Sequence, residues 1–148
     1  MKGKIIIILF AVVFLCASTL VFAKNYAVIV HPDNPTPTLT AKDLKMIFLG
    51  EKTTWPDGQA LKAAVLKNGE VHKEFLRDFV KLSPLKFSIH WKQKIFTGNA
   101  TGSYINFFKI EDQVKENIKA NPTAIGYIST NSVDDTVKEI KISSPGKE

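Results

Sequence analysis

Residues 60–81 have the sequence ALKAAVLKNGEVHKEFLRDFVK, and this stretch decides the fold class of the chain. The apolar run from Ala60 to Leu66 predicts a buried strand, and the polar residues 67–70 predict a loop. A helix is predicted from Val71 to Lys81, because apolar residues recur there at helical spacing. A strand that leads through a short loop into a helix is the repeating unit of α/β proteins.

The alternation of strands and helices continues towards both ends of the chain. Further strands are predicted at Asn25–His31, Ala124–Ile128 and Val137–Ile142, where β-branched and other apolar residues cluster. Three prolines between residues 32 and 37 predict an extended segment without regular structure. The interleaving of these strands with helices predicts the α/β class.

Three more helices are predicted from their start signals and apolar spacing. Thr40 and Asp43 form a capping box before a short helix that ends at Gly50. Ser83 and Pro84 start a second helix. Its apolar residues are Phe87, Ile89, Trp91, Ile95 and Phe96. An amphipathic helix is predicted from Ile110 to Ala120.

Residues 1–23 have the parts of a secretory signal peptide. Lys2 and Lys4 are basic, residues 5–15 form an apolar run, and residues 21–23 end in a small residue suited to cleavage. The run is shorter than the roughly 20 apolar residues of a membrane helix. The sequence predicts a signal peptide over 1–23, a mature domain over 24–148 with no membrane span, and a periplasmic location. An uncleaved N-terminal anchor is the alternative.

The predicted mature chain is mildly basic and lacks cysteine. The whole chain has 20 Lys and Arg residues against 14 Asp and Glu, and removal of Lys2 and Lys4 lowers the net charge from +6 to +4. This charge favours an anionic partner, but it is too small and dispersed to indicate nucleic acid. The only cysteine, Cys16, lies in the predicted signal peptide, so disulfides and thiol catalysis are excluded from the mature chain.

The motifs favour a protein that is not an enzyme and uses no cofactor. His31, His72 and His90 are not spaced as metal ligands, which argues against a metal site. The chain contains no Gly-x-Ser-x-Gly elbow, His-Glu-x-x-His motif or P-loop. A binding function is therefore the favoured prediction.

Two blocks of sequence stand out, Ile47-Phe48-Leu49-Gly50 with Trp55, and Ala124-Ile125-Gly126-Tyr127. Together with less specific segments between them, they resemble, in order, the phosphate-type substrate-binding proteins of ABC transporters. The resemblance implies a periplasmic-binding-protein type II-like lobe, in which a mixed sheet is flanked by helices. Full-length members of that family bind an oxyanion between two lobes. This chain is about half that size and resembles the hinge strand with the second lobe.

The resemblance also implies a ligand loop at residues 67–72. Family members place a basic residue and an Asp-Gly-Ser-Gly-Thr-like run there. The matching residues here are Lys67, Asn68, Gly69, Glu70 and His72, without the Ser and Thr hydroxyls. A loop that enters a helix N-terminus offers an anion free N–H groups and the positive end of the helix dipole. Lys67 would add charge, Asn68 and His72 would donate hydrogen bonds, and Glu70 would accept a proton from monohydrogen phosphate. A plain polar loop is the alternative.

A second loop at residues 98–103 offers Thr101 and Ser103 as uncharged donors to the same ligand. The function predicted is a secreted, non-enzymatic solute-binding domain for phosphate or a similar oxyanion. The alternative is a ligand-free interaction or sensor-partner module of the same fold, whose partner is an envelope protein or a second copy of the chain. Trp55 and Trp91 are predicted to pack in the core.

Overall fold

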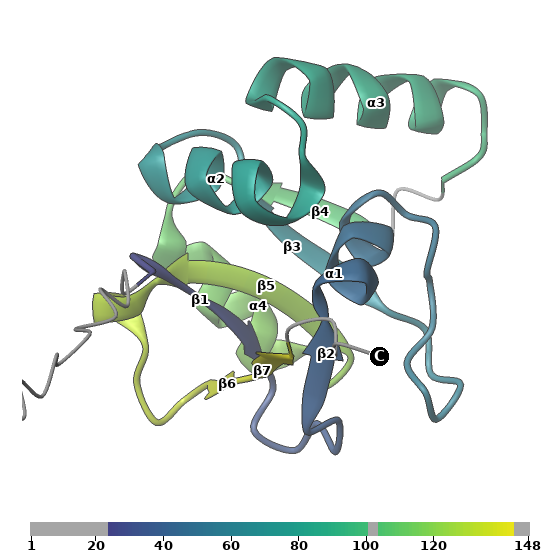
Figure 1. Cartoon of the computed structure of the whole chain (residues 1–148). Coiled ribbons are helices and arrows are strands. Elements are labelled where there is room, and N and C mark those ends of the chain that lie inside the picture. Colours follow the sequence, from purple (N-terminus) through teal and green to yellow (C-terminus); the bar gives the residue numbers. More distant parts are fainter. Residues whose placement is uncertain (1–23, 101–103, 144–148) are drawn as a thin grey trace, which may run out of the picture.

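The computed structural model describes residues 24–100 and 104–143 (Figure 1). The predicted signal peptide, Thr101 and Ser103 lie outside the described residues. One five-stranded sheet has the strand order β4-β3-β5-β1-β6. Its strands are β1 (Tyr26–Val30), β3 (Lys62–Leu66), β4 (Ile105–Phe108), β5 (Ala124–Ser129) and β6 (Lys138–Glu139). β3 is parallel to both β4 and β5, whereas β1 is antiparallel to β5 and β6, so the sheet is mixed as predicted.

Helices cover both faces of this sheet. They are α1 (Ala41–Phe48), α2 (Glu70–Phe75), the π-helical turn η1 (Leu76–Val80), α3 (Pro84–Phe96), α4 (Glu111–Ala120) and the 3₁₀ turn η2 (Thr130–Ser132). Tyr127 of β5 faces α1 and α2, where its ring stacks on Phe75 with 3.9 Å between centroids. The neighbouring Gly126 lies against Val114 of α4 on the other face. Successive residues of a strand point to opposite faces, so β5 separates the two helical layers.

The predicted helix starts of α1 and α3 are confirmed. The Thr40 side chain accepts a hydrogen bond from the Asp43 N–H at 3.0 Å, and the Asp43 carboxylate accepts one from the Thr40 N–H at 3.0 Å. Ser83 caps α3 by accepting from the Lys86 N–H at 3.3 Å. The helix predicted at 71–81 begins one residue earlier, and its second half is the π-helical turn η1.

One strand was not predicted and another differs in extent. Residues 105–108 form β4, which the sequence does not indicate, because four residues are too few to show a period. The strand predicted at 137–142 is divided at Ile140. Its first part is β6, and its second part is β7 (Lys141–Ser143), which pairs in parallel with β2 (Thr38–Thr40). β2 continues the segment that the prolines make extended.

Both tryptophans pack in the core, as predicted. Trp55 donates its indole N–H to the Thr123 carbonyl at 2.9 Å, and Trp91 donates to the Phe48 carbonyl at 3.0 Å. The other apolar residues of α3 differ in burial, because Phe87 is buried whereas Ile89, Ile95 and Phe96 are 44%, 45% and 93% exposed. Among the described residues, no helix combines the length and apolar character that crossing a membrane requires.

Candidate functional site

The carboxyl ends of β3, β4 and β5 lie at one edge of the sheet, because these three strands are parallel. Ligands of open α/β sheets bind outside this edge. The predicted ligand loop follows β3 there, and Lys67, Asn68, Gly69 and Glu70 are all exposed. The fold therefore places this loop where a binding site is expected.

The structure divides the predicted ligand residues between two cavities. Lys67 and His72 line a cavity of about 460 Å³ beside α3, which we call the α3 pocket. Glu70 lines a cavity of about 450 Å³ beside the start of β1, which we call the β1 pocket. Asn68 and Gly69 line neither of these two cavities. The loop thus borders two surfaces with different chemistry.

The α3 pocket is lined mostly by apolar residues, together with two lysines. Its apolar residues are Leu66, Pro84, Phe87, Trp91, Ile95 and Phe107. Its polar residues are Lys67, His72, Ser88 and Lys92. No carboxylate is among these lining residues, so the two ammonium groups are available to an anion.

The β1 pocket is less suited to an anion. Glu70 and Glu74 contribute two carboxylates to its lining, whereas Lys24 contributes one ammonium group. The Asn25 amide, a potential donor, is within 3.4 Å of the Glu74 carboxylate and is used there. Like charges in one site raise the cost of binding, so an oxyanion is favoured in the α3 pocket over the β1 pocket.

His72 is a buried donor rather than an exposed loop residue. Its side chain belongs to a residue that is 2% exposed, and its Nδ1 lies 2.6 Å from the Tyr127 hydroxyl oxygen. Burial lowers the pKa of His72 to about 4, and burial raises the pKa of Tyr127 above its usual value. Both groups are therefore neutral at pH 7. Nδ1 of His72 is the acceptor found for the buried Tyr127 hydroxyl among the described residues, so we assign the hydroxyl as the donor, which leaves the imidazole proton on Nε2.

The Nε2 atom of His72 is open to the α3 pocket. No hydrogen bond to Nε2 is found among the described residues. Every fully buried side-chain nitrogen or oxygen of these residues has a hydrogen-bond partner, so Nε2 is not fully buried. Nε2 must therefore be reached from the cavity that His72 lines. The sequence indicates His72 only as a donor on the loop, because its burial depends on the distant Tyr127.

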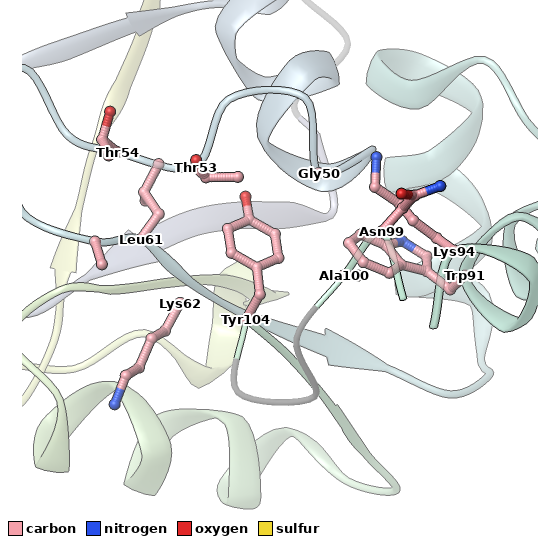
Figure 2. Close-up of a pocket in the computed structure, with 11 residues that line it drawn as sticks. Gly50, Thr53, Thr54, Leu61, Lys62, Trp91, Lys94, Asn99, Ala100 and Tyr104 are labelled. Atoms are coloured by element: carbon pink, nitrogen blue, oxygen red, sulfur yellow. The ribbon is translucent and has the colours of Figure 1, made fainter. Parts of the chain in front are cut away.

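The second predicted loop borders a different cavity (Figure 2). Asn99 and Ala100 line a cavity of about 400 Å³ together with Trp91, Lys94 and Tyr104. Tyr104 directly precedes β4, so this cavity lies at the amino ends of the parallel strands. The described residues on either side of Thr101 and Ser103 are thus at the edge opposite Lys67.

The hydroxyl group that Tyr104 contributes to this second cavity is engaged in hydrogen bonds. The Tyr104 hydroxyl oxygen lies 2.7 Å from the Ile47 carbonyl oxygen and 2.9 Å from that of Lys52. Trp91 lines this cavity as well as the α3 pocket and separates the two. Within residues 24–100 and 104–143, no cluster of His, Cys, Asp or Glu is arranged to hold a metal ion.

A mixed α/β lobe with a polar loop and a pocket at the carboxyl edge of its parallel strands has the architecture of a ligand-binding domain. The family model for the PBP superfamily domain matches residues 17–145. The chain therefore belongs to the PBP superfamily domain family. No protein of curated function matches the sequence significantly.

Three solved structures with a similar fold come from phosphate transport. A proposed phosphate ABC transporter substrate-binding protein from Clostridium perfringens, solved with bound phosphate, is 24% identical with a TM-score of 0.62, and the match covers 80% of this chain and 44% of that one. An ABC-type phosphate transport receptor from Vibrio cholerae is 19% identical with a TM-score of 0.60, covering 80% and 46%. PstS from Borrelia burgdorferi is 17% identical with a TM-score of 0.57, covering 83% and 49%. The chain thus spans less than half of each of these proteins.

Proposed function

We propose that this protein is a secreted, non-enzymatic solute-binding domain that binds phosphate or a similar oxyanion at the α3 pocket. The observation that carries the proposal is the joint position of Lys67, His72 and Lys92 in one cavity without a carboxylate. Family membership and the phosphate-transport proteins of the same fold support it. The carboxyl edge of the parallel strands is also where such folds bind ligands.

The available donors indicate modest affinity for an inorganic ion. Lys67 and Lys92 are exposed, so water screens their charges, and the His72 donor is neutral. Each hydrogen bond to a charged group contributes about 1.5–3 kcal/mol before desolvation costs. Two or three such bonds correspond to dissociation constants in the range of about micromolar to millimolar.

Calorimetric titration of the purified protein with phosphate and sulfate tests the proposed site. We expect Lys67→Ala to weaken phosphate binding at least severalfold. Lys42→Ala is the matched control, because Lys42 is also an exposed lysine and lines neither the α3 pocket nor the β1 pocket. Equal affinities of Lys67→Ala and the unmodified protein would remove this loop from the site.

The same titration tests the role predicted for Glu70, whose carboxylate would accept the proton of monohydrogen phosphate, which sulfate does not carry. Glu70 lines the β1 pocket and not the α3 pocket, so this role does not fit an ion bound in the α3 pocket. We expect Glu70→Gln to leave the relative affinity for phosphate and sulfate unchanged. A lower preference for phosphate in Glu70→Gln would show that the carboxylate reaches the bound ion and would place the site nearer the β1 pocket.

Export to the periplasm is part of the proposal. The basic start, the apolar run and the small residue at Ala23 support cleavage before Lys24. The test is to express the full chain in a bacterium with an outer membrane and to measure the mass of the intact protein in the periplasmic extract. We expect the mass of a chain that begins at Lys24. Uncleaved protein in the membrane fraction would favour the N-terminal anchor.

The exposed face of α3 favours a second candidate, an interaction module of the same fold. Leu85, Ile89 and Phe96 are 70%, 44% and 93% exposed along one helix. α3 contains three lysines and no acidic residue, so pairing of two copies through α3 would bring like charges together. An envelope protein with an acidic, apolar surface is the better fit. A monomer in light scattering that forms no periplasmic crosslink through α3 would count against this function.

A further inference from the structure

We infer that the natural ligand of the α3 pocket is an organic anion, in which an oxyanion head is joined to a small apolar body such as an aromatic ring. This inference rests on the proposed function, because it assigns the ligand class of the same pocket. It concerns the walls of the cavity.

The walls of the α3 pocket have little to offer a bare inorganic ion. Six apolar residues line it, among them Ile95, which is 45% exposed, and the half-buried Phe107. A fully hydrated ion loses water against such walls without gaining hydrogen bonds. An apolar group, in contrast, is stabilised by leaving water there. The lining therefore favours a ligand that is apolar over most of its surface.

The polar groups of the pocket are few and differ in depth. Lys67 and Lys92 are exposed and lie where a charged head remains in contact with water. The neutral Nε2–H of His72 belongs to a buried residue and is suited to an uncharged acceptor such as an ester oxygen. Ligand pockets commonly combine mostly apolar walls with a few oriented polar groups in this way.

The cavity is also large enough for such a ligand. Its volume of about 460 Å³ lies within the range of about 300–1,000 Å³ that is usual for small-molecule sites. One wall is α3, from Pro84 to Ile95, and the opposite wall is formed by the ends of β3 and β4. Figure 1 shows α3 as a separate helix at the top of the molecule, with β3 and β4 below it.

The test compares two ligands with the same head. The purified protein is titrated calorimetrically with inorganic phosphate and with phenyl phosphate at the same pH and ionic strength. We expect phenyl phosphate to bind at least about tenfold more tightly, because its ring replaces water against the apolar walls. Equal affinities for the two ligands would overturn the inference and leave the proposed oxyanion site intact. If neither ligand binds, the inference and the proposed oxyanion site are both overturned.

Two neighbouring phenylalanines provide matched variants. Phe107 lines the α3 pocket, whereas Phe108 lines a cavity beside α4, and both are half-buried. We expect Phe107→Ala to reduce the preference for phenyl phosphate severalfold and Phe108→Ala to leave it unchanged. The reverse result would place the ring elsewhere and overturn the inference.

A surface variant keeps the test valid if Phe107→Ala does not fold. Lys92 is exposed on α3, and Lys92→Gln removes its charge without disturbing the core. Lys92→Gln should weaken both ligands by a similar factor of a fewfold, because both have the same head. Unchanged binding of both ligands by Lys92→Gln would exclude the α3 pocket as their site.

Discussion

Helices α3 and α4 both lie beside the sheet, but they differ in how much of their apolar surface is buried. In α4, Val114 and Ile118 are fully buried against the sheet. In α3, Phe87 and Trp91 are buried, while Leu85 and Phe96 remain 70% and 93% exposed. Both large apolar side chains of α4 are therefore covered, whereas those of α3 are covered only in part.

The difference reflects what lies beneath each helix. α4 packs directly on β5 and β3. α3 is held mainly through Trp91, which donates to the Phe48 carbonyl at 3.0 Å, and His90, whose Nε2 lies 3.0 Å from the Leu49 carbonyl oxygen. The Trp91 side chain lines two cavities. The apolar core residues of α4 are therefore closed off by packing, whereas α3 leaves an apolar cavity next to the ends of β3 and β4.

Removal of the Trp91 ring should cause the largest loss of stability, because this ring connects α3 to the rest of the domain. Trp91→Ala deletes a buried aromatic side chain and its hydrogen bond, and it joins the two cavities. We expect the free energy of unfolding to fall by about 3–5 kcal/mol. Urea denaturation measures this loss, with the exposed Lys92→Ala as the control. A loss below about 1 kcal/mol would mean that α3 is held in another way.

Acid should act through the inner wall of the α3 pocket. Burial lowers the pKa of His72 to about 4 from 6.5, so the unfolded chain binds more protons at this residue between these two values. The free energy of unfolding therefore falls as the pH falls from about 6.5 to about 4, and the loss reaches about 2–3 kcal/mol near pH 4.5. Urea denaturation at pH 7 and pH 4.5 measures it. The same loss in His72→Gln would show that another group is responsible.

The contrast between α3 and α4 also marks how far the sequence could predict the fold. The capping box of Thr40 and Asp43 and the start of α3 at Ser83 are local signals, and the structure has both. In α3, however, apolar residues occur on more than one side of the helix, so the period does not reveal which side is buried. Only the tertiary position of α3 decides that Trp91 is inside and Phe96 outside.

The candidate site was also predictable only where local sequence signals mark it. The loop at Lys67 follows a predicted strand and enters a predicted helix, so its place at the sheet edge follows from local order. Lys92 and Phe107 line the same pocket from α3 and β4, which are distant in sequence. No spacing or motif connects these residues. The contact of His72 with Tyr127 is likewise non-local, which is why its burial was not predicted.

A substitution at Gly50 tests how closely the Trp91 ring of α3 packs against the end of α1. Gly50 has φ +71°, and a Cβ there would lie 2.7 Å from the Trp91 ring. We expect Gly50→Ala to lower the free energy of unfolding by about 2 kcal/mol, from backbone strain and from displacement of the ring. Gly58→Ala is the matched control, because Gly58 has φ +87° with open space around it and reports strain alone. Thermal and urea denaturation measure both variants. An equal loss in the free energy of unfolding in the two variants would mean that the Trp91 ring moves aside without a loss of stability.

The smallest effect is expected on the outer side of α3. Phe96 is 93% exposed, so Phe96→Ser should change the free energy of unfolding by no more than about 0.5 kcal/mol, in contrast to Trp91→Ala five positions earlier. Urea denaturation at several protein concentrations measures it. A loss above about 1 kcal/mol that grows with concentration would show that a second copy covers this face in solution. A concentration-independent loss of that size would instead mean that Phe96 packs against its own chain, and the difference between α3 and α4 would disappear.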